Sequence, residues 1–346
     1  MCTMGKKFSA VNGLLLLFVL FFIVSCSDMM DSYGPTGQEE EIIRTTADEW
    51  IQVDNTGFPV GEYIYGVSYG NGRFVAFGYN SLAYSSDGKT WIHPAGQWYE
   101  SETLMFADAV NGNGVWIVVA AGYPNVGRST DNAVSWDEIP TPFTRQIYGV
   151  SYHNDVFVAV AYDGQIAYSE DKGLSWTRVD PTPLGNDYLY DVAYGNDRFV
   201  AVGTNTIGYN SGDYANSNDW LSAQSIPGYY SSGIFRTVAY GNGLFITGYG
   251  EAITYSSDGN NWQLESTMPT SFDGVGGPYA VTFGAGLYVA VGASNTIVYS
   301  VDADIWIRAS DPGFSDAVNP NILGVAYGNG IFVATGRDGK IAYSVR

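Results

Sequence analysis

The chain has little charge, few basic residues and almost no cysteine or histidine. Of its 346 residues only 14 % are charged, and 35 acidic residues face 15 basic ones. Typical soluble domains carry about 25 % charged residues. The resulting net charge of −20 would repel the phosphates of nucleic acid, so we exclude nucleic acid as a partner. The Ala, Glu, Lys and Leu heptads of a coiled coil are also missing.

Long hydrophobic runs are missing as well. The longest is the 11-residue run 14–24, whereas a membrane-spanning helix needs about 20 apolar residues. With Lys6 and Lys7 before it, this run is typical of a secretory signal peptide, which we assign to residues 1–25. Cleavage there would remove Cys2, so the remaining chain could form no internal disulfide and must be stabilised by burial alone.

The end of this run, Ile23-Val24-Ser25-Cys26, resembles a bacterial lipobox. The resemblance implies that Cys26 is lipidated and that the protein is anchored in the bacterial cell envelope, at the outer membrane or the cell surface. We expect residues 26–48, which contain the acidic run 39–41, to form a flexible tether. The alternative is an ordinary secreted protein that is cut near Ser25.

Glycine and aromatic residues are abundant, and they recur at a fixed period. A turn such as Asn71-Gly72 is followed by an aromatic residue in each of seven units, and these aromatics lie 41 to 46 residues apart. They are Phe74, Trp116, Phe157, Phe199, Phe245, Tyr288 and Phe332. A second series follows, at Trp91, Trp136, Trp176, Trp220, Trp262 and Trp306. A period of this length is typical of propellers and other repeat folds.

Each unit predicts four short strands, with a hairpin turn after the first and an apolar second strand. Four strands cannot bury both of their faces alone, but seven such sheets packed radially can. We therefore predict an all-β fold, a seven-bladed β-propeller over residues 49–346. The last unit lacks its Trp, and Trp50 lies in step with the other Trp residues. We expect this N-terminal segment to complete the C-terminal blade. A β-sandwich or a non-propeller solenoid is the alternative.

The segment Ser169-Glu-Asp-Lys-Gly-Leu-Ser-Trp176 has the pattern Ser-x-Asp-x-Gly-x-x-Trp. It resembles the Asp box of the sialidase/BNR-repeat propellers, and shorter or altered copies recur in other units. The resemblance implies a propeller fold but no particular activity, since hydrolases, assembly factors and receptors share it. We expect the box aspartates to stabilise turns rather than to act as catalytic acids. They are Asp87, Asp131, Asp171, Asp258 and Asp302.

The candidate ligand-binding residues lie in the loops on the opposite face from the Asp boxes. This face holds the loops between the second and third strands and the segments from blade to blade, and such loops on a rigid scaffold usually carry function. The candidates are Tyr79, Tyr123, Tyr162, Asp163, Tyr249, Glu251, Arg337, Asp338, Trp98 and Tyr99. Aromatic faces beside carboxylates suit a sugar, and Tyr and Trp also anchor protein partners. Packing between blades is the alternative role.

These features favour a non-catalytic, membrane-anchored scaffold that binds a glycan or a protein partner outside the cytoplasm, as a monomer. Catalysis has less support, because the arginine motif of sialidases is missing; if there is an activity, we expect a glycoside hydrolase. An assembly factor for envelope proteins is a further alternative. The sequence shows no cofactor fingerprint and no metal motif, and His93 and His153 are too few for a histidine site. We expect His153 to be a solvent-facing turn residue.

Overall fold

The computed structural model describes residues 47–94, 104–181, 184–185, 187–223, 233–250, 252–264, 277–314 and 321–344. All of them belong to one compact unit, Glu41–Arg346. The predicted signal peptide, Cys26 and most of the tether lie outside the described residues. Within the described residues no helix is long and apolar enough to cross a membrane.

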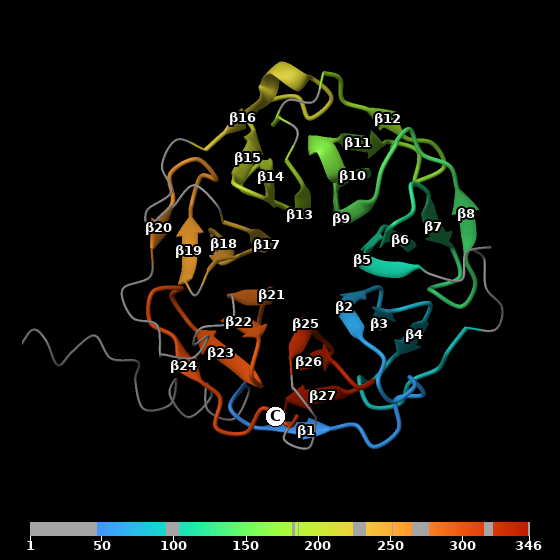
Figure 1. The fold of residues 1–346 in the computed structure, drawn as a ribbon, viewed down its shortest axis with the longest axis vertical. Helices are drawn as coiled ribbons and strands as arrows, with labels where there is room; N and C mark the ends of the chain where they lie inside the picture. The colour runs from blue at the N-terminus through green and yellow to red at the C-terminus, as the bar shows by residue number, and fades with distance from the viewer. Residues whose placement is uncertain are drawn as a thin grey trace, which may run out of the picture. The chain divides into compact units, whose positions relative to one another are not determined.

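Seven antiparallel sheets stand in a ring around a central axis (Figure 1). We number the blades in the order of their innermost strands. These are β2 (Ile64–Gly70), β5 (Met105–Gly112), β9 (Ile147–His153), β13 (Leu189–Gly195), β17 (Phe235–Gly241), β21 (Pro278–Gly284) and β25 (Ile322–Gly328). The seven-bladed propeller predicted from the repeats is confirmed.

The second strand of each blade is buried on both faces, as its apolar sequence predicts. These strands are β3 (Arg73–Gly78), β6 (Val115–Ala121), β10 (Val156–Ala161), β14 (Arg198–Gly203), β18 (Leu244–Tyr249), β22 (Leu287–Gly292) and β26 (Ile331–Gly336). The third strands are β4 (Leu82–Ser85), β7 (Val126–Ser129), β11 (Ile166–Ser169), β15 (Thr206–Asn210), β19 (Ala252–Ser256), β23 (Thr296–Ser300) and β27 (Ile341–Ser344).

The outermost strands are short. They are β8 (Asp137–Ile139), β12 (Thr177–Arg178), β16 (Trp220–Ser222), β20 (Gln263–Leu264), β24 (Ile307–Arg308) and β1 (Trp50–Gln52). In blade 1 the fourth strand is reduced to one bridge, in which the backbones of Tyr84 and Ile92 exchange two hydrogen bonds of 2.9 Å. Two single turns of 3₁₀ helix, η1 (Tyr162–Gly164) and η2 (Ser217–Asp219), are the described helical elements.

The N-terminal strand closes the ring. Strand β1 pairs antiparallel with β27, with Trp50 opposite Ser344, so the last sheet has the order β1-β27-β26-β25. The backbone N–H of Val53 extends this pairing by donating to the carbonyl of Ile341 at 2.8 Å. Closure by the Trp50 segment is therefore confirmed, and it covers a strand edge that would otherwise be exposed.

Trp50 takes the place of the Trp that ends each Asp box. Its indole N–H donates to the carbonyl of Ala47, three residues earlier, at 2.9 Å. Trp306 makes the same bond to Ala303, and Trp262 makes it to Gly259. Trp50 is 3 % exposed, and its ring centroid lies 6.3 Å from that of Phe332. The turn of blade 7 is thus divided between the two ends of the propeller sequence.

Neighbouring blades pack through a glycine set against an aromatic ring. The last glycine of an inner strand lies so close to the next blade that an added Cβ would meet a ring carbon at 2.0 to 2.2 Å. This occurs for Gly112 against Tyr152, Gly195 against Tyr240, and Gly328 against Tyr69. Any larger residue would push the blades apart, because interiors are close-packed.

Blade 3 replaces this glycine by His153, which packs differently from our expectation. Its ring stacks on Tyr194 of blade 4, with centroids 3.5 Å apart and an interplanar angle of 11°. The side chain is half-buried rather than directed into solvent. Burial lowers the pKa of His153, while the nearby Asp197 raises it. His153 is therefore a packing residue between two blades.

Replacing Trp50 by alanine tests the closure. We expect Trp50→Ala to lower the free energy of unfolding by about 3–5 kcal/mol, as the loss of other large buried aromatics does. Denaturant titration followed by circular dichroism measures this change. The control is Ile51→Ala in the same strand, whose side chain is 46 % exposed. Equal stability of the two variants would contradict the role of Trp50 in closing the ring.

Candidate functional site

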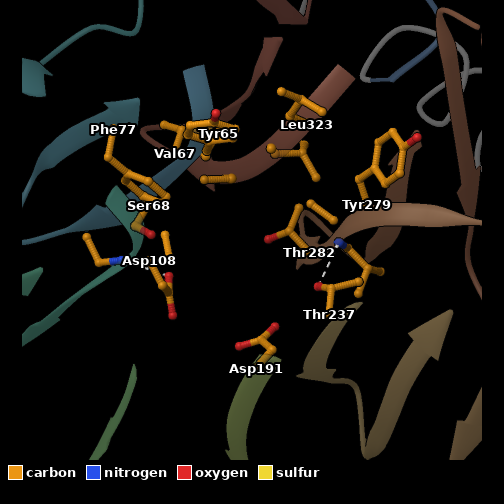
Figure 2. A pocket seen from close by; sticks show the side chains of 18 of the residues that line it. Tyr65, Val67, Ser68, Phe77, Asp108, Asp191, Thr237, Tyr279, Thr282 and Leu323 are labelled. Atoms are coloured by element: carbon orange, nitrogen blue, oxygen red, sulfur yellow. Dashed lines mark hydrogen bonds between the residues drawn. The ribbon is translucent and has the colours of Figure 1, made fainter. Parts of the chain in front are cut away.

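The inner strands enclose a cavity of about 350 Å³ on the ring axis. Its wall at one end consists of one residue from near the start of each inner strand, the second residue in six of the strands and the third in β5. These residues are Tyr65, Ala107, Tyr148, Tyr190, Arg236, Tyr279 and Leu323. Figure 2 shows Tyr65, Leu323 and Tyr279 side by side along this wall. Four half-buried tyrosines and one arginine therefore stand around the axis.

A β-bulge at the same position in every blade turns these side chains towards the axis. In blade 1 the register between β2 and β3 shifts between Ile64 and Gly66, which leaves Tyr65 unpaired. The other six blades show a shift at the equivalent position, and in blade 5 both Arg236 and Thr237 are unpaired. Such bulges redirect a side chain and are common beside functional sites.

Two carboxylates lie deeper in the cavity. Asp108 on β5 and Asp191 on β13 occupy the residue after the bulge, and both reach into the enclosed space (Figure 2). Asp108 accepts the N–H of Ala109 on one oxygen at 2.7 Å and the N–H of Val150 on the other at 2.9 Å. The bond to Val150 joins blade 2 to blade 3.

Asp191 repeats the arrangement between blades 4 and 5. Its two oxygens accept the N–H groups of Val192 at 2.7 Å and Val238 at 2.8 Å. Thr237 continues the series towards blade 6, because its hydroxyl accepts the N–H of Val281 at 3.3 Å (Figure 2). Each side chain thus accepts an N–H from the inner strand of the next blade, which is the edge strand of its sheet.

Both aspartates are harder to ionise than usual. Burial among the inner strands raises the pKa of Asp191 to about 7, against the pull of its two N–H bonds. Burial also raises the pKa of Asp108 well above its usual value, and the charge of Asp191 raises it further. Part of each side chain still faces the water-accessible cavity, so each carboxylate is open to a ligand that enters there.

The predicted residues Tyr79 and Arg337 lie beside this cavity rather than in its wall. The N–H of Tyr79 donates to the carbonyl of Tyr63 at 3.2 Å, and the Arg337 guanidinium lies 4.8 Å from the centre of the Tyr63 ring. Tyr63 in turn stacks on Tyr65, with centroids 5.8 Å apart. Burial, with Tyr63 and Tyr79 nearby, raises the pKa of Tyr65. The loops of blades 7 and 1 therefore extend the tyrosine wall outwards.

A second cluster extends it at blades 3 and 4. The predicted Tyr162 meets Tyr188 edge-on at 4.2 Å, and Tyr188 stacks on the cavity residue Tyr190 at 5.9 Å. A hydrogen bond with Tyr162 raises the pKa of Tyr188 to about 12. The predicted Asp163 lies 3.9 Å from Arg145. We call the end of the ring that carries these clusters and the loops after the second strands the loop face.

The other predicted residues are scattered. The hydroxyl of Tyr123 donates to Glu138 on the outermost strand of its own blade. Tyr249 packs on Phe235 and lines a separate hollow of about 260 Å³ beside Arg236. Asp338 has a positive φ of 60° in the loop after β26. Trp98, Tyr99 and Glu251 lie outside the described residues.

Sequence reasoning missed the residues that line the cavity. Tyr65, Tyr148, Asp108, Asp191 and Arg236 were not among the candidates that the sequence indicated. A signal was present, because the residue after the bulge is Gly, Ala or Thr in the other five blades and Asp only in blades 2 and 4. The bulge that turns these residues to the axis depends on the sheet, so the repeat alone did not reveal it.

The aspartates of the Asp boxes are turn residues. Asp258 accepts the side chain of Ser256 at 3.0 Å and the N–H groups of Asn260 and Asn261 at 2.9 and 2.8 Å. Equivalent bonds to a serine and to backbone N–H groups hold the other four aspartates. These bonds hold the box aspartates within their turns, as expected for residues that stabilise turns.

The Asp-box turns also form hydrogen bonds with the preceding blade. Asn329, in the hairpin of blade 7, donates to the carbonyl of Ser86 in the box of blade 1 at 2.7 Å. Asn196 of blade 4 donates likewise to Ser257 of blade 5 at 2.8 Å, and Arg198 donates to Asp258. The boxes and hairpins therefore share one end of the ring, the box face, opposite the loop face.

The box aspartates predict a loss of stability in acid. Burial raises the pKa of Asp258, but its hydrogen bonds to Asn261, Asn260 and Ser256 together outweigh burial and lower this pKa to about 2. A lowered pKa in the folded state stabilises the protein above the unfolded value of about 4, and this is lost as pH falls towards 2. We expect Asp258→Asn to melt below the wild type at pH 7, with a gap that shrinks between pH 4 and pH 2. Calorimetry measures the melting temperatures of the variant and of the wild type. Asp54→Asn, a change at an exposed aspartate, serves as the control.

No family model matches the sequence, and no curated protein matches it. Solved structures do match. A catalytically inactive virginiamycin B lyase from Staphylococcus aureus, solved with quinupristin, is 15 % identical with a TM-score of 0.69, over 86 % of this chain and 99 % of that one. YCF48 bound to D1 peptide is 15 % identical with a TM-score of 0.66, over 86 % and 94 %.

A third match is YCF48 from Cyanidioschyzon merolae, 14 % identical with a TM-score of 0.63, over 86 % of this chain and 98 % of that one. At such identities the likeness concerns the backbone alone. The sialidase/BNR resemblance and the lipobox remain predictions. What the matches share with this chain is the fold, and on that ground it is a seven-bladed β-propeller.

Proposed function

We propose that this protein is a non-catalytic binding scaffold, anchored outside the cytoplasm, whose loop face takes up a protein or glycan partner. The observation that carries this proposal is the tyrosine wall at the cavity mouth, extended by the clusters at Tyr63 and Tyr188. Tyrosine gives a large contact area and a polar hydroxyl at low entropic cost. The peptide-bound YCF48 structure supports the peptide as the first partner to test.

A binding screen tests this function. The purified protein is applied to a peptide array and to a glycan array, and hits are titrated in solution. We expect Tyr188→Ala to weaken binding about 10-fold or more, because central aromatic residues dominate most interfaces. The control is Leu174→Ala on the box face, whose side chain is 57 % exposed. Absence of any hit, or equal affinities of both variants, would contradict the proposal.

A glycoside hydrolase is the second candidate, and the pair Asp108 and Asp191 in the cavity is the observation that favours it. Glycosidases use two carboxylates, one of them with a raised pKa. Every carboxylate oxygen of this pair, however, already accepts a backbone N–H. A screen with fluorogenic glycosides decides between the candidates: turnover abolished in Asp191→Asn, with folding retained, would favour the hydrolase.

The anchor is a further part of the proposal. The register of β1 against β27 puts Ala47 at the box face, where the chain enters the ring. A lipid on Cys26 would tether the protein through residues 26–48, which enter the ring at the box face. The point where the tether enters the ring is therefore at the opposite end from the cavity mouth.

Loss of the acceptor cysteine tests the anchor. We expect Cys26→Ala to move the protein from the detergent phase to the aqueous phase in a detergent-partition assay of cells, with its melting temperature unchanged. Mass spectrometry of the wild type should show a lipid on Cys26. A wild-type protein that is already in the aqueous phase and begins near Ser25 would favour ordinary secretion instead.

A further inference from the structure

We propose that the axial cavity binds a protonated amine or guanidinium group, such as a lysine or arginine side chain inserted from the loop face. The inference rests on the proposed binding function and adds the chemistry of the group that is recognised. Its basis is one cavity of suitable size that combines an aromatic wall with two carboxylates, neither of which forms an ion pair among the described residues.

The two carboxylates have no cationic partner among the described residues. The ion pairs there, Arg145 with Asp163 and Arg178 with Asp180, lie elsewhere. Arg236 is the only cation that lines the cavity within the described part of the chain, and its exposed guanidinium lies 5.7 Å from the centre of the Tyr279 ring. A buried carboxylate is costly without a positive charge beside it, so a cationic ligand would relieve this cost.

The wall around the carboxylates suits such a ligand. Tyr65, Tyr148, Tyr190 and Tyr279 come from four different blades and stand above Asp108 and Asp191. Aromatic faces attract ammonium and guanidinium groups, and cages of this kind recognise organic cations. The cavity, at about 350 Å³, lies at the lower end of the range for small-ligand sites, so it accommodates one side chain.

A metal ion fits the cavity less well. Calcium takes six to eight oxygen ligands, whereas this cavity offers two carboxylates whose oxygens are already bonded to N–H groups. No group of three or more metal-binding side chains occurs in the described residues. The net charge of −20 also draws any cation towards the protein over a distance. Together these facts favour an organic cation.

Small probes test the inference directly. N-acetyl-lysine methylamide, N-acetyl-arginine methylamide and the neutral N-acetyl-norleucine methylamide are titrated into the full chain by saturation-transfer NMR at pH 8. We expect a cationic probe to bind at least 10-fold more tightly than norleucine. Equal affinity for norleucine, or no binding of any probe, would overturn the inference.

Variants locate the site. We expect Asp191→Asn to weaken binding of the cationic probe at least 10-fold, while Asp54→Asn, a change at an exposed acid outside the cavity, leaves it unchanged. If Asp191→Asn does not fold, Tyr148→Leu replaces it, and this change should weaken the cationic probe more than norleucine. Unchanged affinity in the folded cavity variants would count against the site.

The pH dependence gives a readout on the wild type. The pKa of Asp191 is about 7, so the pair loses its charge in acid, and we expect affinity to fall by up to about 100-fold between pH 8 and pH 5. The other charged and titratable groups that line the cavity are Arg236 and six tyrosines. The tyrosines are Tyr65, Tyr69, Tyr148, Tyr190, Tyr279 and Tyr327. Affinity independent of pH would contradict the carboxylates as the binding groups.

Three further outcomes separate this inference from the proposed function. If calcium chloride binds and displaces the cationic probe, the cavity is a metal site and the inference fails. If array partners bind through Tyr188 while no cationic probe binds, the scaffold function stands and only the cation is rejected. If the probes bind but Tyr188→Ala changes no partner affinity, the cavity site stands and the loop-face proposal fails.

Discussion

The fold depends on the pairing of β1 with β27, two strands from opposite ends of the propeller sequence. Each blade is a thin sheet with two apolar faces, and it buries both only because a neighbour stands on either side. An unclosed ring would leave the last blade with an open edge and would let the first and last blades separate. Three paired residues and one buried indole therefore maintain packing all around the molecule.

Closure also creates the central cavity. Seven inner strands around one axis leave a space that side chains fill only in part, and the bulge near the start of each strand turns one residue towards it. The inner strand of each blade is also an edge of its sheet, so its outward N–H groups need acceptors, and Asp108, Asp191 and Thr237 supply them from the preceding blade. The two aspartates that join the blades thus also bring their carboxyl groups into the cavity.

The two ends of the ring, the box face and the loop face, differ in the contacts and side chains that they carry. The box face carries bonds between Asp-box turns and hairpins of neighbouring blades, in the same form at the junctions of blades 4 and 5 and of blades 7 and 1. The loop face differs from blade to blade, with tyrosine clusters at blades 1 and 3 to 4 and an arginine at blade 5. Contacts between blades at the box face stabilise the ring, and the varied loop face provides a surface that can be specific.

The repeat of aromatic residues at a constant spacing was sufficient to predict the blade number, the strand order and the closing role of Trp50. These features follow from local pattern, since a four-stranded unit must bury its faces and a missing Trp must be supplied from elsewhere. Tyr79, Tyr162 and Arg337 were assigned to the loop face from the sequence, because strand direction assigns each loop to a face. The stacking of His153 on Tyr194 could not be predicted, as it depends on the distance between two blades.

The sequence by itself determined the architecture of this protein, because burial requirements repeat with the chain. Only the tertiary structure decided which side chains meet on the axis. Asp108 and Asp191 stand two blades apart and come together because seven strands converge on one line, and the bulge reverses the direction that simple alternation along a strand assigns to Tyr65. Convergence and bulging are properties of the closed ring, and no single repeat carries them.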